Sequence, residues 1–281
     1  MQKIFNTLRI IAKEIHTLLQ DSSTSYLQST NSTGDTQLAV DVAADLLIES
    51  KLLELENVLG ICSEEKSTPI KKNSGQYLIA YDPLDGSSLM DSNLSVGSIF
   101  GIYERDFQAQ NLVASAYIVY GPRTEIIFAD QTKTTYQKLK SNQQWQDLPA
   151  PNLKHQGKIN ATGGTQKFWS NQHKIFIQSF FDEGYRLRYS GGMVPDLHQI
   201  LIKGGGIFSY PTTSDAPNGK LRMLFEVFPF AFIYEKCGGM AIDGKNRLLD
   251  LHCSHIHQTT PCFFGSQYEI QKLLKLDEGA K

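Results

Sequence analysis

Cysteine is scarce in this sequence, and its apolar stretches are short. The four cysteines among 281 residues include no C-x-x-C pair, which argues against a disulfide framework and predicts reduced thiols. No apolar run reaches the roughly 18 to 20 residues that span a bilayer. The N-terminus also lacks the apolar core and small-residue cleavage site of a signal peptide. We therefore expect a cytoplasmic protein with no membrane partner.

An excess of charge of one sign is lacking as well. Lysine and arginine total 27 against 29 for aspartate and glutamate, so the formal net charge is −2. Without a basic excess, we do not expect a nucleic-acid partner. The 41% hydrophobic and 20% charged residues are typical of a soluble enzyme with a sizeable core.

A change in composition near the middle of the chain predicts two subdomains. The segment 138–157 is less apolar than its flanks and contains Pro149 and Pro151, as a boundary often does. Residues 1–150 combine helices with several sheet strands, whereas residues 151–281 alternate helices and strands more regularly. The predicted fold class is α/β, with an α+β first subdomain.

Hydrophobic periodicity indicates the individual elements. Ile4, Leu8, Ile11 and Ile15 repeat at helical spacing, so the chain should open with an amphipathic helix. The serine- and threonine-rich stretch 21–36 is predicted to be a loop. Further helices are expected over 37–55, 165–181 and 194–203 and around Pro229, and strands over 58–63, 77–81, 98–103, 112–120, 125–129, 185–189 and 207–210.

The stretch 81–88, YDPLDGSS, carries the clearest chemical signal. A buried strand over 77–81 should deliver Asp82 and Asp85 just beyond its end, where proline and glycine force a turn. Two such close carboxylates ionise side by side only if cations lie between them. The following Gly86, Ser87 and Ser88 offer N–H groups and hydroxyls with little bulk, which suits a phosphate. The pattern predicts a metal beside a phosphate ester, although a plain acidic turn is the alternative.

Acidic residues in three other parts of the chain favour the metal interpretation. The strand over 58–63 ends in Glu64 and Glu65, and Asp35 and Asp41 lie near the start of the second helix. Asp35 could equally cap that helix. Glu226 is a lone acid among apolar residues, and since an isolated buried carboxylate is costly, it either has a partner in the core or ligates a cation.

Several motifs together resemble the class I fructose-1,6-bisphosphatase family. They are YDPLDGSS, the preceding SEE, and SVGSIFGIY, RYSGGMVPD, GIFSYP, GKLRMLFE and HQTTPCFFGS. The resemblance covers nearly the whole chain, from about Leu8 to Ser266. The family lies within the magnesium-dependent, lithium-sensitive phosphatases that include inositol monophosphatase. The resemblance implies a sugar-phosphatase fold, a layered αβαβα sandwich of two subdomains, with most metal ligands in 1–150 and most substrate contacts in 151–281.

The resemblance also implies a role for individual residues. The metal ligands would be Glu64, Asp82, the carbonyl of Leu84, Asp85 and Glu226, with Glu65 and Asp35 close to the metals. Asp41 and Glu65 would be the catalytic pair that activates water. Substrate contacts would come from Asp85, Gly86, Ser87, Ser88, Asn160, Tyr189, Tyr210, Lys220 and Arg188. Arg188 would reach a neighbouring subunit's site, which implies a homo-oligomer, expected to be a tetramer. Two or more Mg²⁺ ions per subunit are implied, with Mn²⁺ or Zn²⁺ as alternatives.

The implied reaction is hydrolysis of the 1-phosphate of fructose 1,6-bisphosphate to fructose 6-phosphate, a step of gluconeogenesis. GGMVPD and LFEV resemble the sister family of sedoheptulose-1,7-bisphosphatases, so that activity, alone or alongside, is the first alternative. A catalytically silent sugar-phosphate-binding protein is the second.

One regulatory feature of the family is predicted to be weak or absent, namely inhibition by AMP. The sequence starts directly with its first helix, without the extension that binds AMP in many members. Gln76 and Glu104 stand where those members usually carry basic residues, and an acidic side chain repels a phosphate.

Overall fold

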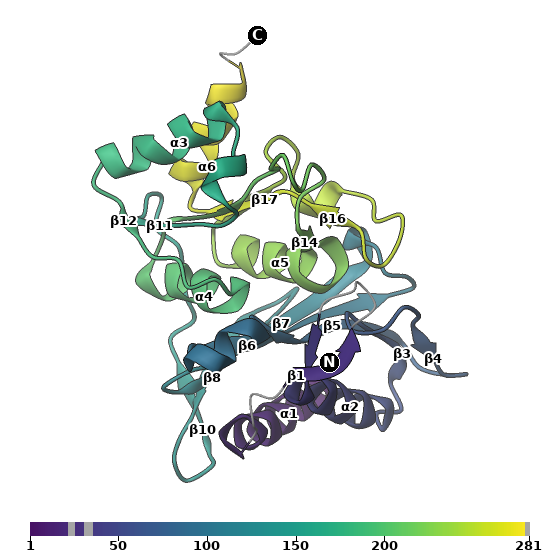
Figure 1. Ribbon diagram of the computed structural model, residues 1–281. Helices are drawn as coiled ribbons and strands as arrows, with labels where there is room; N and C mark the ends of the chain where they lie inside the picture. Colours follow the sequence, from purple (N-terminus) through teal and green to yellow (C-terminus); the bar gives the residue numbers. More distant parts are fainter. Residues whose placement is uncertain (22–25, 31–35, 279–281) are drawn as a thin grey trace.

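The computed structural model describes residues 1–21, 26–30 and 36–278, and in it helices and sheets alternate in five layers (Figure 1). Helices α1 (Gln2–Asp21) and α2 (Ala39–Leu53) form the first layer and α4 (Met193–Lys203) and α5 (Phe228–Lys236) the third. The last layer holds α3 (Asn171–Asp182) and α6 (Gln267–Glu278). This arrangement confirms the predicted layered α/β fold.

An eight-stranded sheet forms the second layer. Its strands, in spatial order, are β10 (Trp145–Leu148), β9 (Thr134–Leu139), β8 (Thr124–Asp130), β7 (Leu112–Tyr120), β6 (Val96–Glu104), β5 (Tyr77–Asp85), β3 (Val58–Ser63) and β4 (Ile70–Lys71). Neighbouring strands are antiparallel except β3 and β5, which are parallel. The apolar side of α1 packs on this sheet through residues such as Ile4, Leu8 and Ile11, as its helical spacing predicts.

A five-stranded sheet forms the fourth layer. Its order is β12 (Arg186–Leu187), β11 (Ile159–Thr162), β13 (Ile207–Tyr210), β17 (Cys262–Gly265) and β15 (Met240–Ile242). The first three strands run parallel, and β17 is antiparallel to β13 and β15. Two small strand pairs lie outside the main sheets, β1 (Tyr26–Thr30) with β2 (Thr36–Leu38) and β14 (Leu221–Arg222) with β16 (Thr259–Thr260).

Helix α5 is apolar on every side because it lies between the two sheets. Residues 228–234 are all buried, and the largest hydrophobic cluster joins this helix to strands of both sheets. Pro229 occupies its first turn, where a missing N–H costs nothing, as the sequence predicted. Gly204, with φ of 81°, ends α4 in the left-handed conformation that favours glycine. The middle layer is therefore packed against both sheets.

Some expected elements differ from those observed. The stretch 21–36 was expected to be a loop, but residues 26–30 form β1, which pairs with β2. The helix expected over 165–181 is a 3₁₀ turn at Gln166–Phe168 followed by α3, because the Ser170 side chain accepts a hydrogen bond from the His173 N–H and so starts the helix there. The strand expected over 185–189 is only Arg186–Leu187.

Two further expectations concern the whole chain. Cys62, Cys237, Cys253 and Cys262 are all free, buried thiols, as expected. Within the described ranges, no helix combines the length and apolarity needed to cross a bilayer. The division into subdomains 1–150 and 151–281 stays a prediction.

A buried carboxylate fastens α4 to the first sheet. Glu125 on β8 is 3% exposed and accepts hydrogen bonds from Arg123 (2.6 Å) and from Tyr136 on β9, and its Oε2 lies 3.1 Å from Nε2 of His198 on α4. Although burial alone would raise it, these hydrogen bonds lower the pKa of Glu125 to about 2. The ionised Glu125 side chain is therefore more stable in the folded protein than in the unfolded chain.

We expect Glu125→Gln to lower the free energy of unfolding by about 3 kcal/mol at pH 7, at roughly 1.4 kcal/mol per pKa unit. Because folding lowers the pKa of Glu125, its ionised carboxylate stabilises the folded protein at pH values above 4.5, the ordinary pKa of the group. This contribution is lost as the pH falls through about 2. Urea unfolding at pH 7 and near pH 2 measures the change. The exposed Glu56→Gln is the control, and an equal loss at both pH values would contradict the account.

Candidate active site

A cavity of about 320 Å³ opens beside the end of β5, and it collects most of the residues that the sequence singled out. Its walls come from the first turn of α2, the ends of β3, β5 and β13, and the segments that precede α4 and α5. The predicted residues that line it are Asp41, Glu64, Glu65, Asp82, Leu84, Asp85, Gly86, Ser87, Ser88, Tyr189, Tyr210, Lys220 and Glu226.

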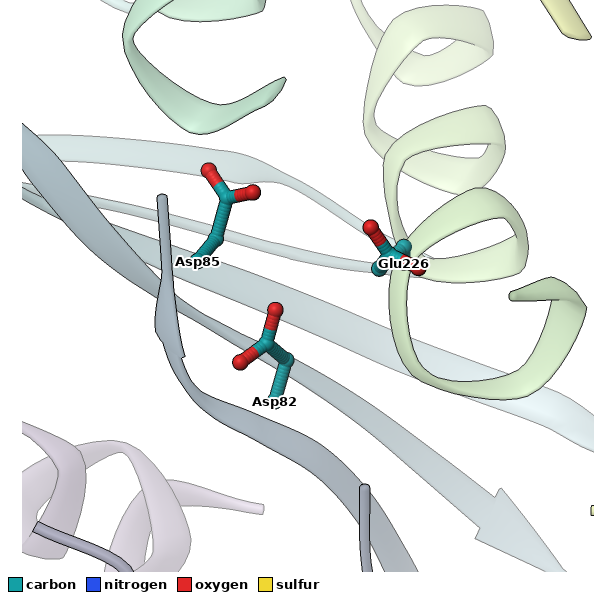
Figure 2. Close-up of side chains that lie close together, drawn as sticks. All are labelled: Asp82, Asp85 and Glu226. Carbon is teal, nitrogen blue, oxygen red and sulfur yellow. The ribbon is translucent and has the colours of Figure 1, made fainter. Parts of the chain in front are cut away.

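Three carboxylates meet in this cavity. Asp82 and Asp85 come from β5, and Glu226 comes from the π-helical turn η4 (Met223–Val227) that leads into α5. One oxygen from each lies within 4.8 Å of the others. Figure 2 shows the three side chains directed toward one another. All three are at least nine-tenths buried.

A break in the strand pairing lets the two aspartates face the same cavity. In a regular strand, side chains three positions apart point to opposite faces. The register between β5 and β6 shifts between Asp82 and Asp85, and such an irregularity re-aims the side chain that follows it. The Leu84 N–H donates to Asp82 Oδ1 (2.9 Å), and the Ser98 hydroxyl donates to the Pro83 carbonyl (2.8 Å). One hydrogen bond within the turn and one from β6 thus hold it in place.

Burial and mutual repulsion make this cluster electrostatically unusual. Burial raises the pKa of Asp85 to about 7 and that of Glu64 to about 8, and the charge of Glu226 adds to both shifts. Burial also raises the pKa of Asp82 and of Glu226. Side chains with only carboxylate oxygens, gathered in one buried place, fit a hard divalent cation such as Mg²⁺, which would remove their repulsion.

Arg222 is a cavity residue that the sequence analysis missed. Its guanidinium pairs with Glu64, and its backbone N–H donates to Glu226 Oε2 (2.6 Å). It therefore joins two of the predicted metal ligands. The signal was present in GKLRMLFE, where only the lysine and the glutamate were assigned.

Asp85 also holds the start of α4. Its two oxygens accept hydrogen bonds from the Met193 N–H (3.3 Å) and the Val194 N–H (2.6 Å). A carboxylate at a helix N-terminus is favourable, because the first N–H groups have no partner within the helix. Gly191, Gly192 and Met193 consequently line the cavity, a contribution that the sequence analysis did not foresee.

The predicted phosphate cradle lies directly after Asp85. Gly86 has φ of 76°, a conformation that favours glycine, and it starts the 3₁₀ turn η1 (Ser87–Ser92). The Ser87 and Ser88 residues line the cavity wall. Small residues at this place leave room for a bulky anion.

Asp41 and Glu65, the expected water-activating pair, both line the cavity. Asp41 is buried in the first turn of α2, and Glu65 follows β3. Asp45, one turn later on α2, has a structural role instead: it accepts hydrogen bonds from the hydroxyls of Ser63 (2.6 Å) and Tyr81 (2.9 Å).

Three expected site residues are not among those that line the cavity. Asn160 is fully buried on β11, and its side-chain amide has no hydrogen-bond partner among the described residues. Arg188 lines a different cavity and donates to Gln199 Oε1 (3.0 Å). Asp35 lies outside the described residues.

Sequence comparison gives close relatives of this chain. A protein of Helicobacter hepaticus described as fructose-1,6-bisphosphatase class 1 is 57% identical over 277 residues, which cover 98% of this chain and 99% of the relative. A protein of Campylobacter hominis with the same description is 55% identical over 275 residues, covering 97% and 98%.

Structure comparison and family models agree with these relatives. The Leishmania major fructose-1,6-bisphosphatase in its holo form has a TM-score of 0.91 and 30% identity, covering 99% of this chain and 93% of its own. A Toxoplasma gondii protein assigned as a sedoheptulose-1,7 bisphosphatase has the same score and identity, covering 99% and 94%. Models of the fructose-1-6-bisphosphatase N-terminal and C-terminal domains match residues 1–144 and 153–278. The chain therefore belongs to the fructose-1,6-bisphosphatase family.

Proposed function

We propose that this protein hydrolyses the 1-phosphate of fructose 1,6-bisphosphate, giving fructose 6-phosphate and inorganic phosphate. The observation that carries the proposal is the convergence of Asp82, Asp85 and Glu226 within 4.8 Å beside the Gly86 turn. Family membership and relatives more than 50% identical, described as fructose-1,6-bisphosphatase class 1, support it.

Each site residue expected from the sequence then has a proposed role in the reaction. Glu64, Asp82, the Leu84 carbonyl, Asp85 and Glu226 hold divalent cations, two or more Mg²⁺ per subunit, with Glu65 and Asp35 nearby. Bound there, the cations offset the charge of the phosphate and activate water. Asp41 with Glu65 accepts the proton of the attacking water. Gly86, Ser87 and Ser88 hold the phosphate that leaves, and Asn160, Arg188, Tyr189, Tyr210 and Lys220 contact the sugar and its other phosphate.

Phosphate release by the purified protein tests this proposal. We expect release from fructose 1,6-bisphosphate with Mg²⁺ and none after the metal is removed with EDTA. Inositol monophosphate should be a poor substrate, because it lacks the second phosphate that the C-terminal residues are proposed to bind. Absence of metal-dependent release from any bisphosphate would instead favour a binding protein without catalytic activity.

Sedoheptulose 1,7-bisphosphate is the second candidate substrate, alone or alongside. The support is structural: the Toxoplasma gondii protein fits this chain as well as the Leishmania major enzyme does. The two sugars differ by one carbon, and an active site discriminates only modestly against one extra carbon. The values of kcat/KM for the two sugar bisphosphates should therefore be measured side by side.

Lys220 is expected to contribute to substrate affinity more than to turnover. Its side chain is exposed at the cavity wall, where it can meet the phosphate that is not cleaved. A charge-assisted hydrogen bond is worth about 1.5 to 3 kcal/mol, so Lys220→Gln should raise KM roughly tenfold or more and leave kcat nearly unchanged. Lys174→Gln, exposed on α3, is the control, and a fall in kcat without a rise in KM would refute the role.

AMP is expected to inhibit weakly or not at all. The Gln76 side-chain amide donates to Glu104 Oε1 (2.9 Å), so an amide and a carboxylate occupy the place where many family members have basic side chains. Neither side chain offers a cation to a phosphate, and the carboxylate repels one. Activity is measured at increasing AMP up to millimolar concentration; half-inhibition in the micromolar range would show this to be wrong.

We also infer a cytoplasmic homotetramer that acts in gluconeogenesis. The support for a tetramer is the family resemblance, which assigns Arg188 to a neighbouring subunit's site. Light scattering measures the mass of the assembly, and an active monomer would contradict the inference.

A further inference from the structure

We propose that His257 is a positioning residue that aligns the two parts of the carboxylate cluster. Its ring nitrogen Nε2 lies 3.1 Å from the carbonyl oxygen of Lys66, a contact between residues 191 positions apart. Lys66 directly follows Glu64 and Glu65. The inference deepens the proposed function, since it rests on a cation bound by the cluster, and it does not depend on which sugar phosphate is the substrate.

The carboxylates of the active-site cavity come from two different parts of the fold. Glu64 follows β3, and Asp82 and Asp85 belong to β5, so these three are fixed to the eight-stranded sheet. Glu226 lies in η4, which leads into α5 of the middle layer. A cation bridging the two parts is bound tightly only if their oxygens are held within about 0.5 Å of the bound geometry. Contacts between the parts, beyond the ligands themselves, therefore affect its affinity.

The segment that carries His257 is attached to η4. The Met223 N–H, at the start of η4, donates to the Gln258 carbonyl (2.8 Å). Strand β16, which follows Gln258, pairs with β14, the strand that leads into η4 (Figure 1). The ring centroids of His257 and Phe225 lie 5.5 Å apart. The segment is therefore bound to the element that carries the glutamate of the cluster.

The contact of His257 is made to the other part of the cluster. Lys66 belongs to the turn that follows β3, and its N–H donates to the Ser63 carbonyl (3.2 Å). The Lys66 side chain pairs with Asp45 and Glu49 on α2. These contacts hold the turn to the first layer and the first sheet, whereas the hydrogen bond from His257 joins it to the C-terminal half of the chain.

Arg222 makes a second link between the two parts, but of a different kind. Its guanidinium pairs with Glu64, and its backbone N–H donates to Glu226 Oε2 (2.6 Å). Both partners are proposed metal ligands, so a cation competes with Arg222 for the same oxygens. The His257 contact is to a backbone carbonyl outside the proposed ligand set, and it can therefore persist when a cation binds.

Packing alone is the simpler explanation of a half-buried histidine, and it predicts a different response to substitution. His257→Phe keeps a ring beside Phe225 but removes the N–H that donates to the Lys66 carbonyl. His257→Gln removes the ring but keeps a side-chain N–H that can donate to the same carbonyl. If the hydrogen bond aligns the cluster, the phenylalanine variant is the damaging one, and if packing does so, the glutamine variant is.

Titration of the full-length, metal-free protein with Mn²⁺ tests the proposal, with unbound Mn²⁺ followed by electron paramagnetic resonance. We expect His257→Phe to weaken Mn²⁺ binding roughly tenfold, because loss of a hydrogen bond behind the ligands of a metal site costs about 10- to 100-fold in affinity. His257→Gln should bind nearly as tightly as the wild-type protein. His252→Phe, an exposed position in the same loop, is the control and should leave the affinity unchanged.

Thermal unfolding in EDTA shows whether each variant is folded. Should His257→Phe not fold, His257→Ser removes the ring N–H without adding bulk, and the same weakening is expected. Unchanged affinity in these variants, equal weakening in His252→Phe, or weaker binding by His257→Gln than by His257→Phe would each overturn the proposal. The titration involves no turnover: a wild-type protein that binds Mn²⁺ but releases no phosphate refutes only the proposed hydrolysis, whereas one that binds no Mn²⁺ refutes both.

Discussion

Asp85→Asn should leave no more than about one-thousandth of the wild-type kcat/KM for fructose 1,6-bisphosphate. Charge stabilisation by a cation is worth several kcal/mol in the transition state, and each 1.4 kcal/mol is about tenfold in rate. Asp85 is one of the three carboxylates that meet within 4.8 Å, and a neutral amide is a far weaker ligand for a hard cation. The measurement is kcat/KM at saturating Mg²⁺.

Asparagine is chosen so that a loss of activity can be distinguished from a loss of folding. In the wild-type protein the Val194 N–H donates to Asp85 over 2.6 Å. The amide oxygen of asparagine can still accept this hydrogen bond, so α4 should stay in place. Asp91→Asn is the control, since Asp91 is an exposed acid on the neighbouring η1 turn. If Asp85→Asn unfolds at the wild-type temperature and keeps a tenth of the activity, Asp85 is not a metal ligand.

The sequence located the acidic cluster but not the geometry that brings its members together. Pro83 and Gly86 predict a turn after Tyr81, and the acids around it follow directly. A regular strand would nevertheless direct Asp82 and Asp85 to opposite faces. The shift of register against β6 depends on pairing with a strand further along the chain, which a single sequence does not specify. The common cavity is therefore a tertiary property.

A long-range pair explains the cavity residue that the sequence analysis missed. Arg222 meets Glu64 across 158 positions of sequence, and nothing local to either residue indicates the contact. Arg188 and Tyr189 are neighbours in sequence, yet they line different cavities, as alternation along an extended segment requires. The family motifs likewise assign Arg188 to a neighbouring subunit's site and Tyr189 to the site of its own subunit.

The helices and strands also divide into those that the sequence was sufficient to predict and those that it was not. The apolar spacing in α1 and the continuous apolar run of α5 were sufficient to predict helices, because burial on one side leaves a periodic pattern and burial on all sides leaves an uninterrupted apolar run. Strand β1, Tyr26–Thr30, has polar and apolar residues without alternation, so its pairing with β2 was not predicted. Local pattern predicts elements whose apolar residues form a regular pattern and misses strands whose sequence has none.

Removing one carboxylate from the acidic cluster should stabilise the metal-free protein. We expect Asp82→Asn to raise the free energy of unfolding in EDTA at pH 8, because a group whose pKa is raised by folding destabilises the folded protein at a pH where the unfolded chain would ionise it. Burial and the charges of Glu64, Asp85 and Glu226 raise the pKa of Asp82. Because the folded cluster retains protons that the unfolded chain releases, stability of the metal-free protein should fall as pH rises from about 4 toward the folded-state pKa values, about 7 for Asp85 and about 8 for Glu64.

Asp45→Asn is the matched control, with an expected effect of opposite sign. Asp45 is as buried as Asp82, but its charge is compensated by Lys66 (3.1 Å) and by the hydroxyls of Ser63 and Tyr81. Because the Lys66 side chain is partly exposed, we expect a loss of about 1.5 to 3 kcal/mol, the worth of a hydrogen bond to a charged group. Urea unfolding with EDTA and with Mg²⁺ compares the variants: Mg²⁺ should stabilise the wild-type protein and Asp45→Asn but hardly Asp82→Asn. If both variants lose stability without metal, the cluster is held together by the protein alone, and the cation site has lost its physical basis.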